Sequence, residues 1–361
     1  MAALWKQPIE EFLEPHGVEP LPLSDKLPGI QPRIPRSLQL ALFVASITWA
    51  VAANLIATRA ARGLAVRFQW SDEFLFLDAV FLVFLLAMGF AVLEGIAARN
   101  SPLRHTLGFP RRPTSRVEWA TGAAIGWGVV LLAVLPMAIA GDLHVRLWLE
   151  ARSLWLAGLN LVTVALLSMA AVMAFFGYPY RRLIDAIGSG WATVAMAAIF
   201  GVAATWGRES TYLSTLIAIL FGALLCAAWL RTHGLWLGWG VYCAWLASLG
   251  IVFGLPVGGV DNLSSLVETR AIGAWWLTGG ELGVEGALVT PLLVIAAIVV
   301  VVKVSRDWAW DYTRRPLIPA GYAMDVPPPA QHIEMEKVAS APALVQILPT
   351  TPQTRSVETE R

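Results

Sequence analysis

Long apolar runs alternate with short polar stretches along most of the chain. A helix needs about 20 predominantly apolar residues to cross the hydrocarbon core of a bilayer. The pattern therefore predicts about eight membrane-spanning helices, at residues 38–58, 74–97, 117–140, 154–177, 191–207, 211–231, 235–255 and 284–303. The fifth run is short, so we expect it to be partly tucked into the bundle. The predicted fold class is an all-α, polytopic membrane helix bundle.

The two ends of the chain differ from this apolar middle, the predicted membrane-embedded domain at residues 38–303. Residues 1–37 are polar and rich in proline, so we expect a flexible arm. Residues 304–361 contain the run Pro327–Pro329 and scattered charges, so we expect a disordered tail. With the N-terminus inside, the inner segments hold roughly twice as many lysines and arginines as the outer loops, which predicts that arm and tail are both cytosolic.

Composition and charge narrow the class of protein further. Hydrophobic residues make up 57% of the chain and charged residues 14%, a balance that would leave a soluble domain with too much exposed apolar surface. The net charge of +1 implies no nucleic-acid partner. Both cysteines, Cys226 and Cys243, fall inside apolar runs, so we interpret them as buried small side chains and not as a disulfide or metal site.

Two local patterns predict details of the packing. Residues 178–190 form an amphipathic stretch at the membrane surface, which we expect to turn Leu183 and its apolar neighbours to the membrane and Arg181, Arg182 and Asp185 to water. Gly122 and Gly126 lie one helical turn apart in the third apolar run. Small residues at this spacing predict close packing against another helix.

Three stretches carry the clearest motifs: Ala171–Asp185 (AVMAFFGYPYRRLID), Ile199–Trp206 (IFGVAATW) and Gly234–Pro256 (GLWLGWGVYCAWLASLGIVFGLP). Together they resemble the core of the CPBP family of intramembrane proteases, which includes the type II CAAX prenyl proteases and the bacteriocin-processing Abi proteins. The resemblance covers about residues 85–303 and implies a CPBP-like helical core there. It also implies a location in a bacterial cytoplasmic membrane.

The family's polar residues are replaced in this chain. The run Gly177–Tyr180 matches the family's Gly-Tyr-Pro-aromatic sequence, and Phe200 opens its Phe-x-x-x-His motif. Leu235–Trp236 and Gly254–Pro256 bracket its His-x-x-x-Asn motif. The positions at which the family carries Glu, Glu, Arg, His, His and Asn are here Ala171, Val172, Phe176, Ala204, Tyr242 and Leu246, respectively.

The family's reaction needs the groups that are missing. The resemblance implies that a glutamate activates water, that histidines assist or hold a metal, and that an asparagine stabilises the oxyanion. Apolar side chains do none of this, and the single phenol of Tyr242 is a poor general base at neutral pH. We therefore expect a degenerate member of the family with no catalytic residue, no metal and no cofactor.

Other polar residues within the apolar runs offer no replacement site. Each intramembrane polar group is a functional hypothesis in its own right, and four stand out: Asn54, Asp78, Glu94 and Asn160. None of them comes with a nearby histidine, and the chain has no His-x-x-x-His pair for zinc. We interpret Glu94 as an acid near the cytosolic end of its helix, where its carboxylate can reach the surface.

Three functions remain open from the sequence. The first is a non-catalytic binding or scaffold protein, a pseudoprotease whose former active-site cavity holds a membrane lipid, a prenyl chain or a partner membrane protein. The second is an active intramembrane CAAX-type endopeptidase with an altered site. The third is a small-molecule transporter, although no inverted repeat and no charged row along a span supports it.

Overall fold

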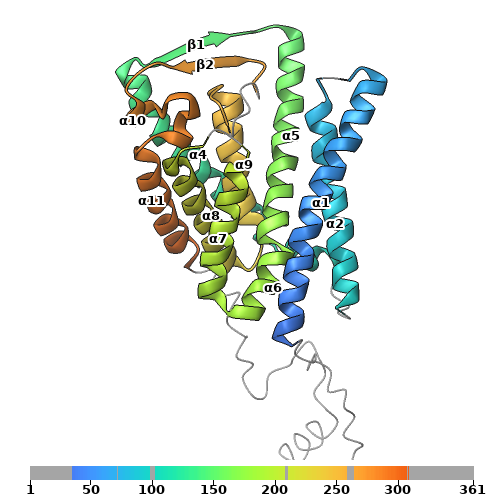
Figure 1. Ribbon diagram of the computed structural model, residues 1–361. Coiled ribbons are helices and arrows are strands. Elements are labelled where there is room, and N and C mark those ends of the chain that lie inside the picture. The colour runs from blue at the N-terminus through green and yellow to red at the C-terminus, as the bar shows by residue number, and fades with distance from the viewer. Residues whose placement is uncertain are drawn as a thin grey trace, which may run out of the picture. The chain divides into compact units, whose positions relative to one another are not determined.

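Helices that run lengthwise through the molecule make up most of the structure, a computed structural model (Figure 1). It describes residues 35–70, 72–97, 102–207, 210–257, 264–306 and 308. The helices are α1 (Arg36–Phe68), α2 (Phe74–Ile96), α3 (Leu103–Thr106), α4 (Ser115–Ala140), α5 (Ala151–Phe176), α6 (Tyr178–Ile187), α7 (Ser189–Thr205), α8 (Tyr212–Thr232), α9 (Trp236–Ala247), α10 (Trp275–Thr278) and α11 (Val289–Val304). A π-helical turn, Ser248–Val252, continues α9, and a 3₁₀ segment, Gly280–Gly286, precedes α11.

Five of the described helical segments are long and apolar enough to cross a membrane: α1, α2, α4, α5 together with α6, and α8. Three shorter apolar helices accompany them, namely α7, α9 with its π-helical turn, and α11. Every one of the eight apolar runs in the sequence thus lies on a helix. These helices identify an integral membrane protein with a helical bundle fold. That all eight cross the membrane stays a prediction.

The fold is not purely helical, because two loops pair into a short antiparallel ribbon. Its strands are β1 (Leu143–Leu147) and β2 (Val267–Ala271), with Leu143 opposite Ala271 and Leu147 opposite Val267. Both stretches lie outside the predicted membrane-spanning runs, where the sequence predicts loops. Backbone groups outside helices still need partners, and strand pairing supplies them here. We call the end of the bundle that carries this ribbon the ribbon end, and the opposite end the α6 end (Figure 1).

The predictions for the two ends of the chain fall largely outside the described residues. The predicted arm at 1–37 overlaps the described part only where α1 begins, at Arg36. The predicted tail at 304–361 overlaps it only around the end of α11. The expected flexibility of both segments therefore stays a prediction.

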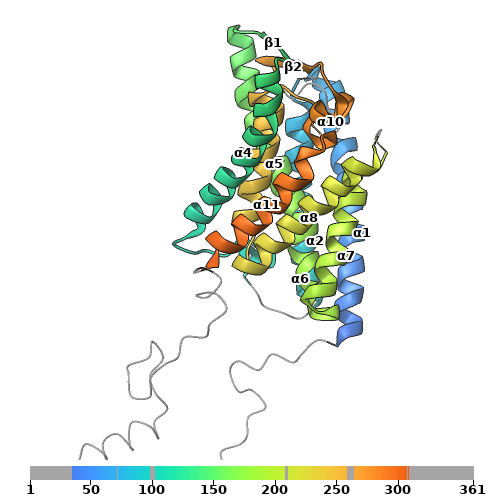
Figure 2. The ribbon, with the colours of Figure 1, turned by 90° about the vertical axis from the view of Figure 1, so that its left-hand side faces the viewer.

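The closest helix crossing joins α4 and α9 through glycines. A Cβ atom at Gly122 would overlap the carbonyl oxygen of Leu237, and one at Gly126 would overlap that of Val241. Gly240 of α9 meets the carbonyl oxygen of Trp119 in the same way. The predicted role of Gly122 and Gly126 in close packing is confirmed. α8 lies between α7 and α11 in Figure 2 and packs against both.

The α1–α2 hairpin attaches to the remaining helices along two lines of contact. α2 packs against α5 along its length, whereas α1 packs mainly against α6 at the α6 end (Figure 1). Direct contact between α1 and α5 is slight. This arrangement leaves room between α1 and α7, next to α5, for an apolar groove.

Candidate functional site

The six positions that the sequence analysis singled out lie on three helices. α5 carries Ala171, Val172 and Phe176, α7 carries Ala204, and α9 carries Tyr242 and Leu246. Val172 and Phe176 are each only 1% exposed. The other four are partly buried.

Aromatic rings connect two of these positions. The rings of Phe176 and Phe200 have centroids 5.3 Å apart, and those of Phe200 and Tyr242 lie 6.1 Å apart. Phe221 of α8 packs on Tyr242 at 5.6 Å. Val172 is part of the same buried core, and Leu246 packs against it. We call Phe176, Phe200, Phe221 and Tyr242 the aromatic cluster. Its rings occupy the interior between α5, α7, α8 and α9.

Ala171 and Ala204 are placed differently from these residues. Ala171 lines an apolar groove next to the aromatic cluster, together with Ala203 of α7. Ala204 follows Ala203 in α7 but does not line the groove. The structure therefore groups Phe176 and Tyr242 around Phe200, and it sets Ala171 on a surface that is open to the side.

The groove has a volume of about 950 Å³ and opens between α1 and α7. Its floor is formed by α5, where small side chains create the hollow: Ala170, Ala171 and Ala174. Bulkier residues, including Ile47, Phe175 and Trp206, form its walls. Asn54 of α1 brings an amide into a lining that is otherwise apolar. Such a hollow suits an apolar guest with one polar group.

A buried ion pair lies at the α6 end and corrects an interpretation made from the sequence. Arg182 of α6 is 0% exposed and donates from Nη2 to Oε2 of Glu94 in α2. Its Nη1 donates to Oε1 of Gln39 in α1 at 3.2 Å, and its guanidinium stacks 4.6 Å from the ring centroid of Tyr178. The expectation that Arg182 faces water was wrong, and so was the surface role of Glu94. Each charge is buried because the other neutralises it.

The other intramembrane polar groups are dispersed. Thr58 of α1 donates to Asp78 of α2 at 3.1 Å. Asn160 is partly buried on α5. Cys226 and Cys243 are both buried thiols, as predicted.

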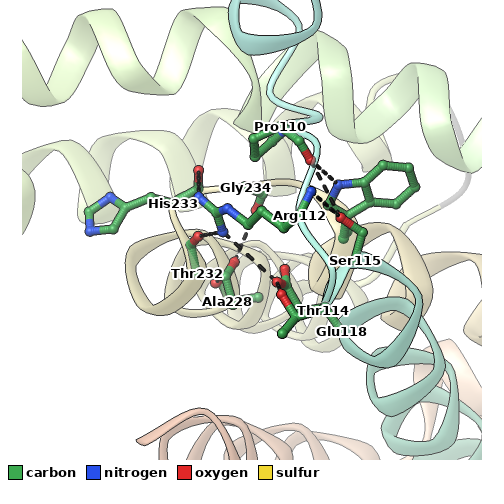
Figure 3. A network of polar contacts seen from close by, with 10 residues as sticks. Pro110, Arg112, Thr114, Ser115, Glu118, Ala228, Thr232, His233 and Gly234 are labelled. Carbon is green, nitrogen blue, oxygen red and sulfur yellow. Dashed lines mark hydrogen bonds and ion pairs between the residues drawn. The ribbon is translucent and has the colours of Figure 1, made fainter. Parts of the chain in front are cut away.

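A second polar network, in the loop before α4, holds the C-terminal end of α8 (Figure 3). Arg112 donates to the carbonyl oxygens of Thr232 and His233, and its Nη1 lies 3.9 Å from Oε1 of Glu118. Thr114 donates to the same carboxylate oxygen at 2.8 Å. The last carbonyls of a helix lack intrahelical partners and carry partial negative charge, so a guanidinium stabilises them. This network is structural, since its groups are engaged with each other.

Two histidines at the α6 end have lowered pKa values. Partial burial lowers the pKa of His105 first, and the positive charge of Arg181 lowers it further. Arg181 Nη1 lies 3.1 Å from His105 Nδ1, so a neutral imidazole can accept its hydrogen bond. Burial and the nearby charge of Arg112 lower the pKa of His233 in the same direction.

The aromatic cluster lacks the polar groups that hydrolysis would need. The aromatic cluster supplies no carboxylate or imidazole, and no group of three or more histidine, cysteine or acidic side chains there could hold a metal ion. What the geometry offers is an apolar groove beside a tightly packed interior. Comparison with protein-family models, curated proteins and solved structures finds no match to this chain.

Proposed function

We propose that this protein is a non-catalytic membrane protein with a CPBP-like core, a pseudoprotease that binds an apolar guest. The three motif stretches and the order of their helices support the resemblance. In the proposed topology all eight apolar helices span a bacterial cytoplasmic membrane, with both termini in the cytosol. The arrangement of lysine and arginine supports this orientation.

One observation carries the proposal: where the family would need polar catalytic groups, this chain has closely packed rings. Phe176 replaces the arginine and packs on Phe200, which in turn packs on Tyr242 in place of a histidine. General acid–base groups and oxyanion donors each contribute orders of magnitude to a rate. An interior of aromatic and aliphatic side chains supplies neither.

The groove between α1, α5 and α7 supports binding as the alternative activity. Burial of apolar surface stabilises a complex by roughly 25 cal/mol per Å², although within a bilayer close packing contributes more than transfer from water. The alanines of the groove floor admit a guest close to the backbone of α5. A lipid tail, a prenyl chain or an apolar segment of a partner protein meets this description.

The test compares cleavage with binding in one preparation. The purified protein in nanodiscs is incubated with farnesylated CAAX peptides and with membrane-protein substrates, beside an active CAAX protease as the positive control. We expect no cleavage, together with apolar molecules that copurify and survive delipidating washes. Turnover that disappears in Tyr242→Phe would overturn the non-catalytic assignment, and a protein without bound guests would overturn the binding role.

A further inference from the structure

The length of the groove distinguishes between possible guests. Its lining residues run from Ile47 to Leu55 on α1, from Leu167 to Phe175 on α5, and from Ala198 on α7 to Trp206, which directly follows α7. At 1.5 Å per residue each segment rises about 12 Å. The hydrocarbon core of a bilayer is about 30 Å thick, so one leaflet contributes about 15 Å. The groove therefore matches the tail of a lipid in one leaflet, whereas a partner transmembrane helix would have to cross both.

The two ends of the groove have different chemistry. Towards the α6 end the lining is apolar, with Ile47, Phe175 and Ala198. Towards the ribbon end it includes Asn54 and Trp206, and Trp206 is 79% exposed. The charged residues Arg208 and Glu209 follow in the sequence. Tryptophan followed by charge is typical of the membrane–water interface, so this end of the groove lies at headgroup level.

Asn54 is the group that can recognise a lipid where its tails join the headgroup. Its side chain is exposed, and it has no hydrogen-bond partner within the part of the chain that the structure describes. An amide at the edge of a hydrocarbon phase is costly unless it is hydrogen-bonded. The region where the tails of a lipid join its headgroup supplies carbonyl oxygens, which accept hydrogen bonds from an amide.

We infer that the groove binds the tail of an ester-linked phospholipid from the leaflet at the ribbon end, with Asn54 donating a hydrogen bond to an ester carbonyl. The tail lies along Ala171 and Ala174 and ends near Phe175. This inference rests on the proposed function, because it names the guest and its orientation. It adds a specificity residue that is distinct from the former catalytic positions.

A matched pair of lipids tests the hydrogen bond. Nanodiscs are prepared with diacyl phosphatidylcholine and its dialkyl ether analogue, which lacks the ester carbonyl, and lipid retained after transfer to detergent is counted by native mass spectrometry. One hydrogen bond within a membrane gives the diacyl lipid an expected preference of about threefold to tenfold. Asn54→Leu should abolish this preference. Ser46→Ala, a buried α1 hydroxyl bonded to Phe43 outside the groove, should keep it.

A second pair of variants tests the groove itself. Ala203→Phe fills the lining from α7, and we expect it to lower retention of both lipids. Val194→Phe, at an exposed position of the same helix outside the groove, is the control and should leave lipid retention unchanged.

The outcomes separate the orientation of the lipid from the binding role. If Asn54→Leu keeps the ester preference, the proposed orientation is wrong although lipid binding stands. If wild type retains no lipid, or Ala203→Phe retains as much as wild type, the proposed binding role fails as well. A copurifying protein that displaces lipid from the groove would overturn the lipid assignment alone.

Discussion

Arg182 and Glu94 form an ion pair that is closed off from solvent, between a short helix at one end of the bundle and the α1–α2 hairpin. The side chains are 0% and 4% exposed, respectively. Within the described residues Oε1 of Glu94 and Nε of Arg182 have no hydrogen-bond partner. The ion pair therefore satisfies only part of the hydrogen-bonding capacity of each side chain. Because Gln39 also accepts from Arg182, one guanidinium connects α6 to both α1 and α2.

Removing one partner of this ion pair should destabilise the protein strongly. Glu94→Gln or Arg182→Met leaves the other charge buried without neutralisation, which costs about 3–5 kcal/mol. The measurement is unfolding in mixed micelles, where the double variant should recover part of the loss. Arg152→Ala is the control: its ion pair with Asp72 is exposed and should contribute at most about 1 kcal/mol. Equal losses for Arg152→Ala and Arg182→Met would contradict this account.

The α4–α9 crossing gives a prediction with a control on the same helix. Gly126→Ala places a methyl group against the carbonyl oxygen of Val241, so the helices must separate, at a cost of about 1–3 kcal/mol. Gly128→Ala has nothing within 4 Å of the new Cβ atom and should be neutral or slightly stabilising. Thermal unfolding of the two variants checks the difference, and a Gly128→Ala loss as large as that of Gly126→Ala would exclude packing as the cause.

Arg112 should contribute to stability through the end of α8. Arg112→Met removes a charged donor from the carbonyls of Thr232 and His233, a loss of about 1.5–3 kcal/mol. Combining it with Glu118→Gln, which removes the neighbouring buried charge, should cost less than the sum of the two single changes. Arg111→Met, at the exposed preceding residue, is the matched control. Faster hydrogen exchange confined to the last turn of α8 would locate the effect.

Stability should fall as the pH falls through the range in which His105 and His233 titrate. Their pKa values are lowered in the folded protein, so below the ordinary value of about 6.5 the unfolded chain binds more protons. Their contribution to the free energy of unfolding is therefore complete above about pH 6.5 and is lost towards lower pH. NMR titration of His105 should show its pKa rising in Arg181→Gln, because that change removes a nearby positive charge. An unchanged pKa would assign the shift to burial alone.

Restoring the family's residues should harm the fold more at some positions than at others. Val172→Glu would bury an unpaired carboxylate at a site only 1% exposed, so we expect severe loss of folded protein. Ala171→Glu places its carboxylate at the groove, where the side chain can bend outward, and should be tolerated better. Yield of monodisperse protein after membrane extraction measures both. Comparable yields would show that position 172 is not in the sealed core.

The apolar helices were predictable because length and hydrophobicity alone determine which segments can lie in a bilayer. Gly122 and Gly126 were predictable for a similar reason, since small residues one turn apart permit close backbone approach. The ribbon was missed because strands as short as Leu143–Leu147 give a weak signal. Alternation in Leu-His-Val-Arg-Leu was the available clue, but its partner lies more than a hundred residues away in the sequence.

The ion pair was missed because helical periodicity gives only the direction of a side chain relative to its own helix. On α6, Arg182 shares the polar face with Arg181 and Asp185, so the pattern predicts that its side chain faces water. Tertiary packing instead buries Arg182 against Gln39 of α1 and Glu94 of α2, while Asp185 stays exposed. The clue was that Gln39 and Glu94 are isolated polar residues in apolar runs, and isolated intramembrane charges need a partner.

The distance between these partners along the chain has a consequence for biogenesis. Arg182 is 88 residues downstream of Glu94, a stretch that translation at 5–20 residues per second completes in about 4 to 18 s. During this delay α2 is already made while its acid still lacks a cation. The bundle can close at the α6 end only after α6 emerges. Insertion of α2 and final assembly of the bundle are therefore separate steps. Until α6 docks, Glu94 is therefore a buried acid without its cation, and only the finished chain neutralises it.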